Sequence, residues 1–395
     1  MRERRIRPHI EEDLRQKMVF VSGPRQCGKS TLARQILASS GGAYYNWDIE
    51  GHRRLLRNNQ PDESSNLWVL DKIHKFGKWR NWLKGLYDLH GTAHPILVTG
   101  SARLDVYGRG GDSLQGRYFP YRLHPFTLSE ILGLRAPATL DAIPSLDQDG
   151  GSHAVETLKD MMELGGFPEP LLSGSQRKAA RWRLGYGARL VREEIRDLEN
   201  LRDLDKVELL YDRLSATVGS VLSINSLRED LEVAFETVRN WIRIFDRLYG
   251  TFRLPPVGAP RVKAVKKEQK LYFWDWPHVE APGPRFENLV AFHLLRLVHW
   301  LEDIEGEKAE LRYFRDHAGH EVDFVVLRRH KPWMAVEVKL DDRPVDPNLK
   351  YLLERVRIPF AFQISLHGVR DWRPPDVNGC KVRVLPAPQF LANLP

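Results

Sequence analysis

The sequence predicts a multidomain α/β protein whose first domain contains a parallel sheet with helices on its faces. Three observations support this fold class. A glycine-rich loop at residues 23–31 lies between an apolar strand and a helix. Short apolar runs then alternate with helical segments up to about residue 135. Finally, 395 residues are too many for one ordinary core, so roughly two to four domains are expected.

The glycine-rich loop reads GPRQCGKST and fits the phosphate-loop pattern of Gly, four residues, then Gly-Lys-Ser. Gly23 and Gly28 allow backbone N–H groups to surround phosphate oxygens at the start of the following helix. We expect Lys29 to reach the β- and γ-phosphates of ATP and Ser30 to bind Mg²⁺, with Thr31 in the same nucleotide-binding set. The alternative is a turn that matches by chance, which the flanking strand and helix disfavour.

Two further strand ends carry candidate nucleotide-site residues. Asp71 follows the apolar run at 66–70, and an acid at the tip of such a strand holds Mg²⁺ directly or through water. Without the phosphate loop, an Asp that only caps a turn would be the better interpretation. Ser101 follows the strand at 95–99, where a hydroxyl can sense the γ-phosphate or position the attacking water.

Composition limits the classes of protein and of site. The net charge of +8 and the pI near 9.4 permit an anionic polymer as partner, although the excess is modest for this length. No uncharged apolar stretch approaches the ~18 residues of a membrane helix. The N-terminus lacks an apolar signal core, so we expect a cytoplasmic protein. Cys27 and Cys380 alone predict neither a disulfide framework nor a thiolate metal site.

The middle of the chain is helical. Residues 136–152 suggest a linker, and Arg181 or Arg183 can be phosphate sensors, although a solvated surface is the simpler interpretation. The segment 234–248 predicts a helix whose apolar stripe faces inward. A basic segment ending at Lys270 then leads into an apolar strand. This order is typical of a winged helix, which either contacts DNA phosphates or serves packing and assembly.

The C-terminal part carries a set of charged residues typical of a metal site. Glu287 lies on the apolar stripe of a helix at 285–298, where an unpaired charge is costly, so a metal or a lysine is expected beside it. Asp323 lies on one strand, and Glu337 and Lys339 share a face of the next. Glu287, Asp323 and Glu337 are candidate Mg²⁺ ligands, and Lys339 can position or deprotonate a nucleophile. The alternative is an inactive site in which Lys339 and Glu337 form a salt bridge.

These motifs together resemble the AAA+-type ATPases of bacteria and archaea that carry a restriction-endonuclease-like C-terminal domain. The set Glu287, Asp323 and Glu337-x-Lys339 is similar to that of the PD-(D/E)xK nucleases. The other matching segments are Gly23–Ser30, Asp71-x-Ile73-x-Lys75 with Trp79, Val98–Ser101, Ser113–Arg117, Pro125-Phe126 and Glu130. The resemblance implies an ATPase core at 1–135, a linker and helical lid at 136–205, a winged helix at 206–280 and a nuclease-like domain at 281–395.

The resemblance also implies an arginine finger and a ring. Arg117 or Arg103 is the candidate that stabilises γ-phosphate charge in a neighbouring subunit of a homo-oligomer such as a hexamer. A salt bridge at the sheet edge is an equal alternative for Arg117. In these ATPases a Glu usually follows the Mg²⁺-binding acid, but here the residue is Lys72. Since an ammonium cannot accept a proton, hydrolysis is expected to slow by roughly 10²- to 10⁴-fold. Alternatively, Lys72 faces outward and His74 orients the water.

Two functional hypotheses follow. The first is an ATP-controlled, Mg²⁺-dependent DNA-processing enzyme, in which the C-terminal set cuts a phosphodiester. The second is a nucleotide-gated, oligomeric DNA-binding or scaffold protein with an inactive nuclease-like domain and little ATP turnover. DNA is the expected partner in both, bound through the winged helix and the C-terminal domain.

Overall fold

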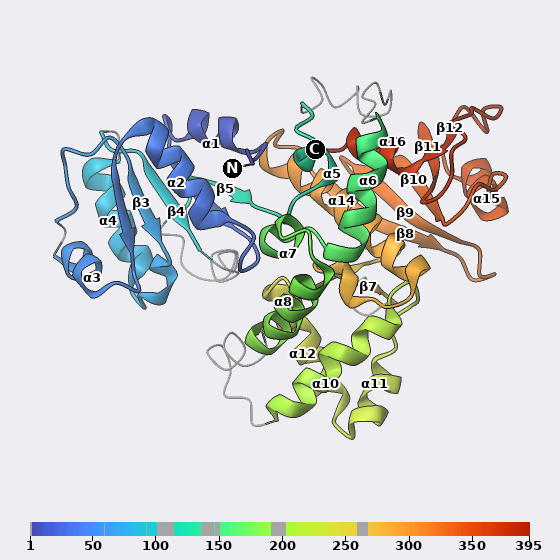
Figure 1. The fold of residues 1–395 in the computed structure, drawn as a ribbon, viewed down its shortest axis with the longest axis horizontal. Helices are drawn as coiled ribbons and strands as arrows, with labels where there is room; N and C mark the ends of the chain where they lie inside the picture. The colour runs from blue at the N-terminus through green and yellow to red at the C-terminus, as the bar shows by residue number, and fades with distance from the viewer. Residues whose placement is uncertain are drawn as a thin grey trace. The chain divides into compact units, whose positions relative to one another are not determined.

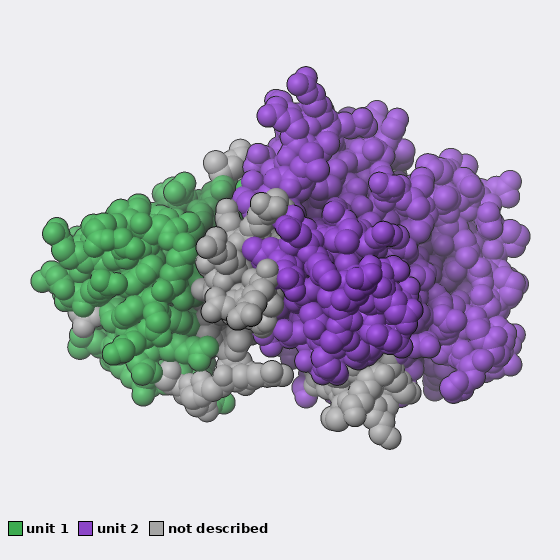
Figure 2. Space-filling view, turned by 90° about the horizontal axis from the view of Figure 1, so that it is seen from below, with its two compact units in different colours: residues 1–125 green, residues 126–395 purple. Residues whose placement is uncertain are grey.

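The computed structural model describes residues 2–58, 60–91, 93–100, 114–135, 146, 151–190, 203–258 and 268–395. The chain forms two compact units, residues 1–125 and 126–395, which Figure 2 distinguishes by colour. Within the described ranges, no helix is long and apolar enough to span a membrane. The predicted α/β class with a parallel sheet in the first unit is confirmed.

A five-stranded sheet in the order β2-β3-β4-β1-β5 forms the centre of the first unit. Every neighbouring pair of its strands is parallel. The strands are β1 (Met18–Ser22), β2 (Ala43–Asn46), β3 (Trp68–Asp71), β4 (Ile96–Thr99) and β5 (Tyr118–Arg122). Because all five strands run the same way, the residues at their carboxyl ends meet along one edge of the sheet.

Helices flank this sheet on either side (Figure 1). Apolar residues of α4 form a core cluster with Phe20, Leu70 and Val98 of the strands. Helix α2 contacts β2, β3 and β4, and buries Leu32 and Ile36. The helices of the unit are α1 (Arg7–Asp13), α2 (Lys29–Ser40), α3 (Glu50–Arg57), the 3-10 turn η1 (Ile73–Lys75) and α4 (Trp79–His90). Strand alternation therefore supplies apolar side chains to both faces.

A second five-stranded sheet, in the order β12-β11-β10-β9-β8, forms the C-terminal part of the second unit. Strands β8, β9 and β10 are antiparallel neighbours, whereas β10, β11 and β12 are parallel. The strands are β8 (Ala309–Arg315), β9 (Glu321–Arg328), β10 (Lys331–Lys339), β11 (Phe360–Ser365) and β12 (Lys381–Pro386). The strands predicted for Asp323 and for Glu337 with Lys339 are thus adjacent.

The long helix α14 (Pro282–Asp303) packs against β8, β9 and β10, and Pro282 starts it without losing an intrahelical hydrogen bond. Helix α15 (Pro347–Arg355) contributes Leu349, Leu352 and Leu353 to a core cluster with β9, β10, β11 and β12. A last helix, α16 (Ala387–Ala392), contacts β11 and β12. Helix α14 therefore lies against the strands β9 and β10, which contain the predicted site residues Asp323, Glu337 and Lys339.

Helices and a short ribbon precede this sheet in the second unit (Figure 1). The elements are α6 (Gly151–Leu164), α7 (Pro168–Leu172), α8 (Gln176–Arg189), α10 (Leu204–Leu214), η5 (Ser215–Thr217), α11 (Ile224–Leu231), α12 (Phe235–Arg247), β6 (Thr251–Leu254), β7 (Lys270–Phe273) and η6 (Trp276–His278). Strands β6 and β7 are antiparallel. Val238, Trp241, Ile242 and Phe245 of α12 are buried, so the predicted apolar stripe is confirmed.

The short helix α5 (Leu128–Ile131) belongs to the second unit, although the sequence prediction placed residues up to 135 in the first domain. The backbone N–H of Leu128 donates to Nε2 of His293 at 3.1 Å, and the Ser129 hydroxyl donates to the Leu394 carbonyl at 2.7 Å. Thr127 and Glu130 form the capping box that the sequence predicts. These contacts fasten α5 to α14 and to the C-terminus.

Candidate functional sites

The phosphate loop requires its two glycines for different reasons. Gly28 adopts φ +100° at the N-cap of α2, a left-handed conformation that side chains disfavour. Gly23 approaches the backbone so closely that a Cβ there would lie 2.2 Å from the Leu123 carbonyl oxygen. The loop is thereby held at the carboxyl edge of the sheet, with the positive end of α2 directed at it.

Lys29 lies folded against this loop. Its Nζ donates to the carbonyl oxygens of Gly23 at 2.8 Å and Pro24 at 2.5 Å. Both acceptors are backbone oxygens that phosphate oxygens of a nucleotide can replace. Thr31, in the same predicted set, is exposed on the first turn of α2.

Asp71 at the end of β3 lies at the centre of a network of hydroxyl groups. Its Oδ2 accepts hydrogen bonds from Ser30 at 2.8 Å and from Tyr44 at 2.5 Å, and its Oδ1 accepts one from Thr99 at 2.7 Å. The residue is 4% exposed. Burial, followed by the bond to Asp71, raises the pKa of Tyr44 to about 12. The structure thus brings together two residues that lie 41 positions apart and that the sequence assigned to Mg²⁺.

The donor set of Ser30 and Asp71 fits a Mg²⁺ ion bound with a nucleoside triphosphate, because a hydroxyl and a carboxylate are hard oxygen ligands. Neither Tyr44 nor Thr99 was predicted from the sequence as a site residue. Thr99 ends β4 and Tyr44 lies within β2, beside β3. Thr99 could have been identified as the polar residue at the end of a parallel strand. Tyr44 could not, because its place beside Asp71 depends on the order of strands in the sheet.

Lys72 pairs with Asp48 beyond the end of β2. Its Nζ lies 2.6 Å from Asp48 Oδ2, and Lys75 Nζ lies 2.6 Å from Oδ1. Although partial burial opposes ionisation of Asp48, the two lysines lower its pKa to about 2. Lys72 adopts φ +60°. It is therefore engaged by an acid outside the Asp71 network, which favours the interpretation that it faces outward.

Arg117 forms an ion pair within its own chain. Its Nε and Nη2 lie 2.7 and 3.3 Å from the two carboxylate oxygens of Asp88 on α4. This is the salt bridge that the sequence analysis left as an alternative to an arginine finger. Ser101 and Arg103, the other candidates at this edge, lie outside the described residues.

The C-terminal candidates also converge. The Asp323 Oδ2 accepts from the backbone N–H of Val338 at 2.9 Å, and the Glu337 Oε2 accepts from the N–H of Asp323 at 3.3 Å. Lys339 Nζ donates to Glu337 Oε1 at 2.7 Å and lies 2.7 Å from Asp346 Oδ2. The predicted face shared by Glu337 and Lys339 thus meets Asp323 across the strand pair.

Glu287 reaches this cluster from α14, and the residue beside it is Lys270 of β7. The Lys270 Nζ lies 3.2 Å from Glu287 Oε1, 2.6 Å from Glu321 Oε1 and 3.7 Å from Asp323 Oδ1. The Tyr272 hydroxyl also donates to Glu287 Oε1, at 2.8 Å. Of the two partners expected for Glu287, a metal or a lysine, the structure contains the lysine.

Of the two interpretations of the basic segment, DNA contact and packing, Lys270 agrees with packing, because its side chain is 1% exposed and surrounded by carboxylates. The other basic residues of that segment, at 261–267, lie outside the described residues. Glu321 and Asp346 were also missed. Glu321 is two residues before Asp323 on the same strand, so alternation alone was a signal for it. Asp346, the N-cap of α15, had no comparable signal.

Burial and neighbouring carboxylates raise the pKa values of two acids in this cluster. Burial, with the nearby Glu337 and Glu287, raises the pKa of Asp323 well above its usual range even though Lys270 opposes the shift. Burial raises the pKa of Glu337 to about 7 against the opposing effect of Lys339. Among the described residues, no group of three or more His, Cys, Asp or Glu side chains is arranged to hold a metal ion. With an ammonium among the carboxylates, this arrangement does not fit Mg²⁺.

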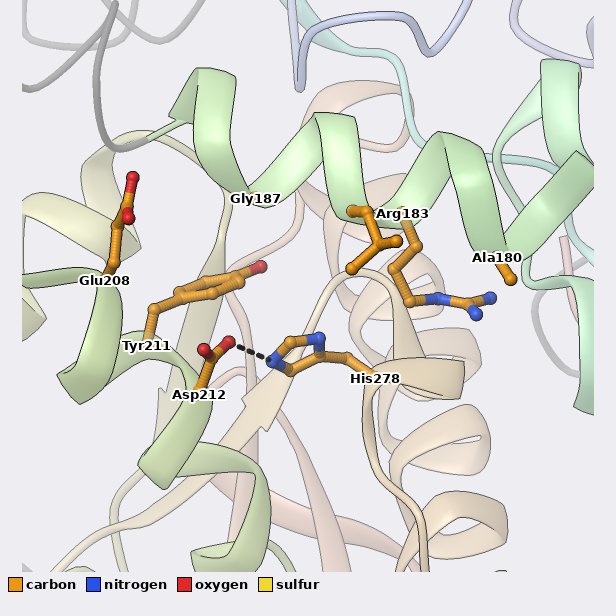
Figure 3. A pocket seen from close by; sticks show the side chains of 8 residues that line it. Ala180, Arg183, Gly187, Glu208, Tyr211, Asp212 and His278 are labelled. Carbon is orange, nitrogen blue, oxygen red and sulfur yellow. Dashed lines mark ion pairs between the residues drawn. The ribbon is translucent and has the colours of Figure 1, made fainter.

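A separate pocket of about 410 Å³ lies in the second unit (Figure 3). Its lining residues are Ala180, Arg183, Leu184, Gly187, Glu208, Tyr211, Asp212 and His278. Arg183 Nε donates to Asp275 Oδ2 at 2.8 Å, and Asp275 is 2% exposed. The simpler interpretation of Arg183 as a solvated surface residue is therefore wrong. None of the predicted catalytic or Mg²⁺-binding residues lines this pocket.

Three parts of the chain match known families. Residues 15–132 match the family described as an AAA domain, in agreement with the ATPase core predicted for this part of the chain. Residues 155–276 and 282–388 match two domains of unknown function, DUF8612 and DUF4143.

Relatives are found in bacteria and archaea. An uncharacterized protein of Mycobacterium tuberculosis is 25% identical over 265 residues, which cover 66% of this chain and 55% of that protein. The match thus spans about half the length of this relative. An uncharacterized protein of Methanocaldococcus jannaschii is 23% identical over 401 residues, covering 89% of this chain and 81% of that protein.

Two solved structures are similar at low identity. One is the Aeropyrum pernix ORC1 protein in complex with DNA, with 14% identity, a TM-score of 0.33, and coverage of 73% of this chain and 92% of that chain. The other is the Thermotoga maritima RuvB Holliday junction branch migration motor, with 16% identity, a TM-score of 0.30, and coverage of 63% and 87%.

Proposed function

We propose that this chain is a nucleotide-gated DNA-binding protein that binds MgATP at its phosphate loop and turns it over slowly. The hydrogen bond of 2.8 Å between Ser30 and Asp71 carries the proposal. This bond joins the hydroxyl of the phosphate loop to the acid at the end of β3, the two groups that bind Mg²⁺ with a nucleotide, and it lies at the N-terminus of α2. Lys29 lies on the same loop, and its two carbonyl partners are replaceable by phosphate oxygens.

Each residue of the site has a distinct part in this proposal. Lys29 pairs with the β- and γ-phosphates, and Ser30 and Asp71 hold the ion. Thr99 and Tyr44 orient the Asp71 carboxylate through its two oxygens. Bound Mg²⁺ would neutralise charge on the phosphates. Slow turnover follows from Lys72, since the position that commonly supplies a carboxylate carries an ammonium engaged by Asp48.

DNA binding is proposed for the helices before the β6–β7 ribbon. Helices α10, α11 and α12 followed by two antiparallel strands have the element order of a winged helix. Opposite its buried stripe, α12 carries Arg239 and Arg243, with the exposed Arg247 at its end. Such contacts to phosphates are individually weak, so a homo-oligomer such as a hexameric ring would strengthen them through avidity. Use of Arg117 as a finger in that ring requires it to leave Asp88.

Thermal unfolding with and without MgATP tests the nucleotide site. Binding at 100 times the dissociation constant stabilises the folded protein by about 2.7 kcal/mol. We expect the wild type to show this gain and Lys29→Ala to lose it, because the phosphates lose their ammonium partner. Lys78→Ala is the matched control, since Lys78 is exposed and precedes α4. Equal stabilisation of Lys29→Ala and wild type by MgATP would refute the nucleotide-site assignment.

DNA binding is tested by fluorescence anisotropy with duplex and branched DNA at several salt concentrations, with and without ATP. The proposal predicts affinity that falls steeply with salt and changes with ATP. Binding that is the same with and without ATP in the wild type would contradict the gating.

A DNA endonuclease is the second candidate, because Glu287, Asp323, Glu337 and Lys339 converge in one cluster. It requires Lys270 to leave its carboxylate partners, since Mg²⁺ does not fit the cluster while the ammonium is there. Cleavage of labelled linear, single-stranded and branched DNA by wild type and Asp323→Ala, with and without Mg²⁺ and ATP, distinguishes it. Cutting that needs both Mg²⁺ and Asp323 would establish the nuclease. If no substrate is cut, the nuclease is excluded and the nucleotide-gated DNA-binding protein is the better interpretation.

A further inference from the structure

We propose that the C-terminal carboxylate cluster is an internal lysine-binding site, in which the Lys270 ammonium takes the place of the divalent cation that the residue pattern predicts. The cluster then fastens the β6–β7 ribbon to the C-terminal sheet. This inference concerns the second unit alone and does not depend on nucleotide binding.

The position of the ammonium is the first argument. Lys270 Nζ lies within 3.7 Å of carboxylate oxygens of Glu287, Glu321 and Asp323, which come from a helix and a neighbouring strand. Three oxygens from converging side chains around one cation are what a metal ligand set would supply. An ammonium with three N–H donors uses the same oxygens without a metal.

Burial is the second argument. The side chain of Lys270 is 1% exposed, and its strand is paired on both sides, with β6 and with a bridge to Val221. The backbone at Gly219 closes in on Glu287, since a Cβ there would lie 3.1 Å from Glu287 Oε2. Lys270 therefore cannot turn to solvent by changing rotamer alone, because the ribbon would have to move with it.

Oxygens of Asp323 and Glu337 that do not face Lys270 are also engaged. Asp323 Oδ2 accepts from the Val338 N–H, and Glu337 accepts from the N–H of Asp323 and from Lys339. Lys339 is shared with Asp346, so a second ammonium neutralises the far side of the cluster. A divalent cation placed here would meet the buried Lys270 ammonium and the partly buried Lys339 ammonium, and repulsion from the buried charge is poorly screened.

Lys270→Met tests the inference, because it keeps most of the length of the side chain and removes the charge. We expect its melting temperature, measured without nucleotide, to fall on the order of 10 °C, since the buried carboxylates lose their counter-ion. Lys331→Met is the matched control, an exposed lysine at the start of β10 that should leave the melting temperature unchanged. Equal melting temperatures for the two variants would overturn the proposal.

Divalent metal provides the second measurement. Titration with MnCl₂ should raise the melting temperature of nucleotide-free Lys270→Met more than that of the wild type, because only in the variant can the freed C-terminal carboxylates take up the ion. A Mn²⁺ site in the wild type that Asp323→Asn abolishes would overturn the proposal. If Lys270→Met does not fold, Glu321→Gln is the test. A melting temperature of Glu321→Gln below that of the wild type supports the internal lysine-binding site, and an unchanged one refutes it.

Discussion

The two carboxylate sites of this chain differ in the chemistry of their partners. Asp71 in the first unit accepts hydrogen bonds from the hydroxyls of Ser30, Tyr44 and Thr99. The acids of the C-terminal cluster instead pair with the ammonium groups of Lys270 and Lys339. Both arrangements satisfy buried oxygens, but only the second also neutralises their charge.

This difference has a consequence for cation binding. A hydroxyl leaves the negative charge of Asp71 in place, and its O–H can rotate to let the oxygen bind a metal instead. A buried lysine compensates the charge, and removing it leaves an unpaired carboxylate in a poorly solvated place. Residue types alone therefore do not make a metal site, since the neighbouring donors decide whether an ion is still attracted.

The largest effects are expected when one acid of each site is replaced by its neutral amide, because the two replacements should affect different properties. Asp71→Asn should lower MgATP hydrolysis by about 10²-fold or more, because several kcal/mol of transition-state stabilisation act through the metal. Its nucleotide-free stability should change little, since hydroxyls beside the new amide nitrogen can accept its two N–H groups while those beside the amide oxygen still donate. Glu287→Gln should do the opposite, costing about 2 kcal/mol of unfolding free energy with unchanged hydrolysis.

Steady-state ATPase assays and urea unfolding measure both variants. If Asp71→Asn hydrolysed MgATP at the wild-type rate, the Mg²⁺ role of Asp71 would be wrong. If Glu287→Gln were as stable as wild type, the contrast between hydroxyl and ammonium partners would fail.

An effect of similar size concerns the pH dependence of stability. Burial raises the pKa of Glu337 to about 7, so the folded state binds this proton more tightly than the unfolded chain does. The stability that Glu337 contributes is full below the ordinary pKa of 4.5 and is lost as pH rises through about 7. The loss amounts to up to about 3 kcal/mol.

Urea unfolding at pH 5, 6, 7 and 8 measures this slope. Glu337→Gln should flatten it, because an amide does not titrate. Glu354→Gln, at an exposed carboxylate, is the control and should retain it. Curves of the same slope for wild type and Glu337→Gln would show that another group titrates.

The smallest expected effect concerns Lys72. Lys72→Glu should raise steady-state ATP hydrolysis roughly tenfold or more, since a carboxylate there can accept a proton from the attacking water. Lys75→Glu is the matched control, because it disturbs the same Asp48 pairing without placing a carboxylate after Asp71. A rate unchanged in Lys72→Glu would mean that the residue after Asp71 does not limit turnover in this chain.

Local sequence determined the elements and the nucleotide loop. The Gly-Lys-Ser pattern between a strand and a helix fixes Lys29 and Ser30, because loop conformation and helix start are set by adjacent residues. Alternation likewise placed Glu337 and Lys339 on one face. The burial stripe of α14 indicated that Glu287 needs a partner, and that expectation also came from spacing alone.

Tertiary structure decided which partner each charge received. Lys270 ends a basic stretch whose sequence is compatible with either DNA contact or packing, and its strand is packed so that the ammonium meets Glu287 and Glu321. Tyr44 reaches Asp71 only because β2 and β3 are neighbours in the sheet. Sequence spacing carries information along one strand or helix, whereas contacts between distant segments depend on packing, and it is those contacts that set the charge of a site.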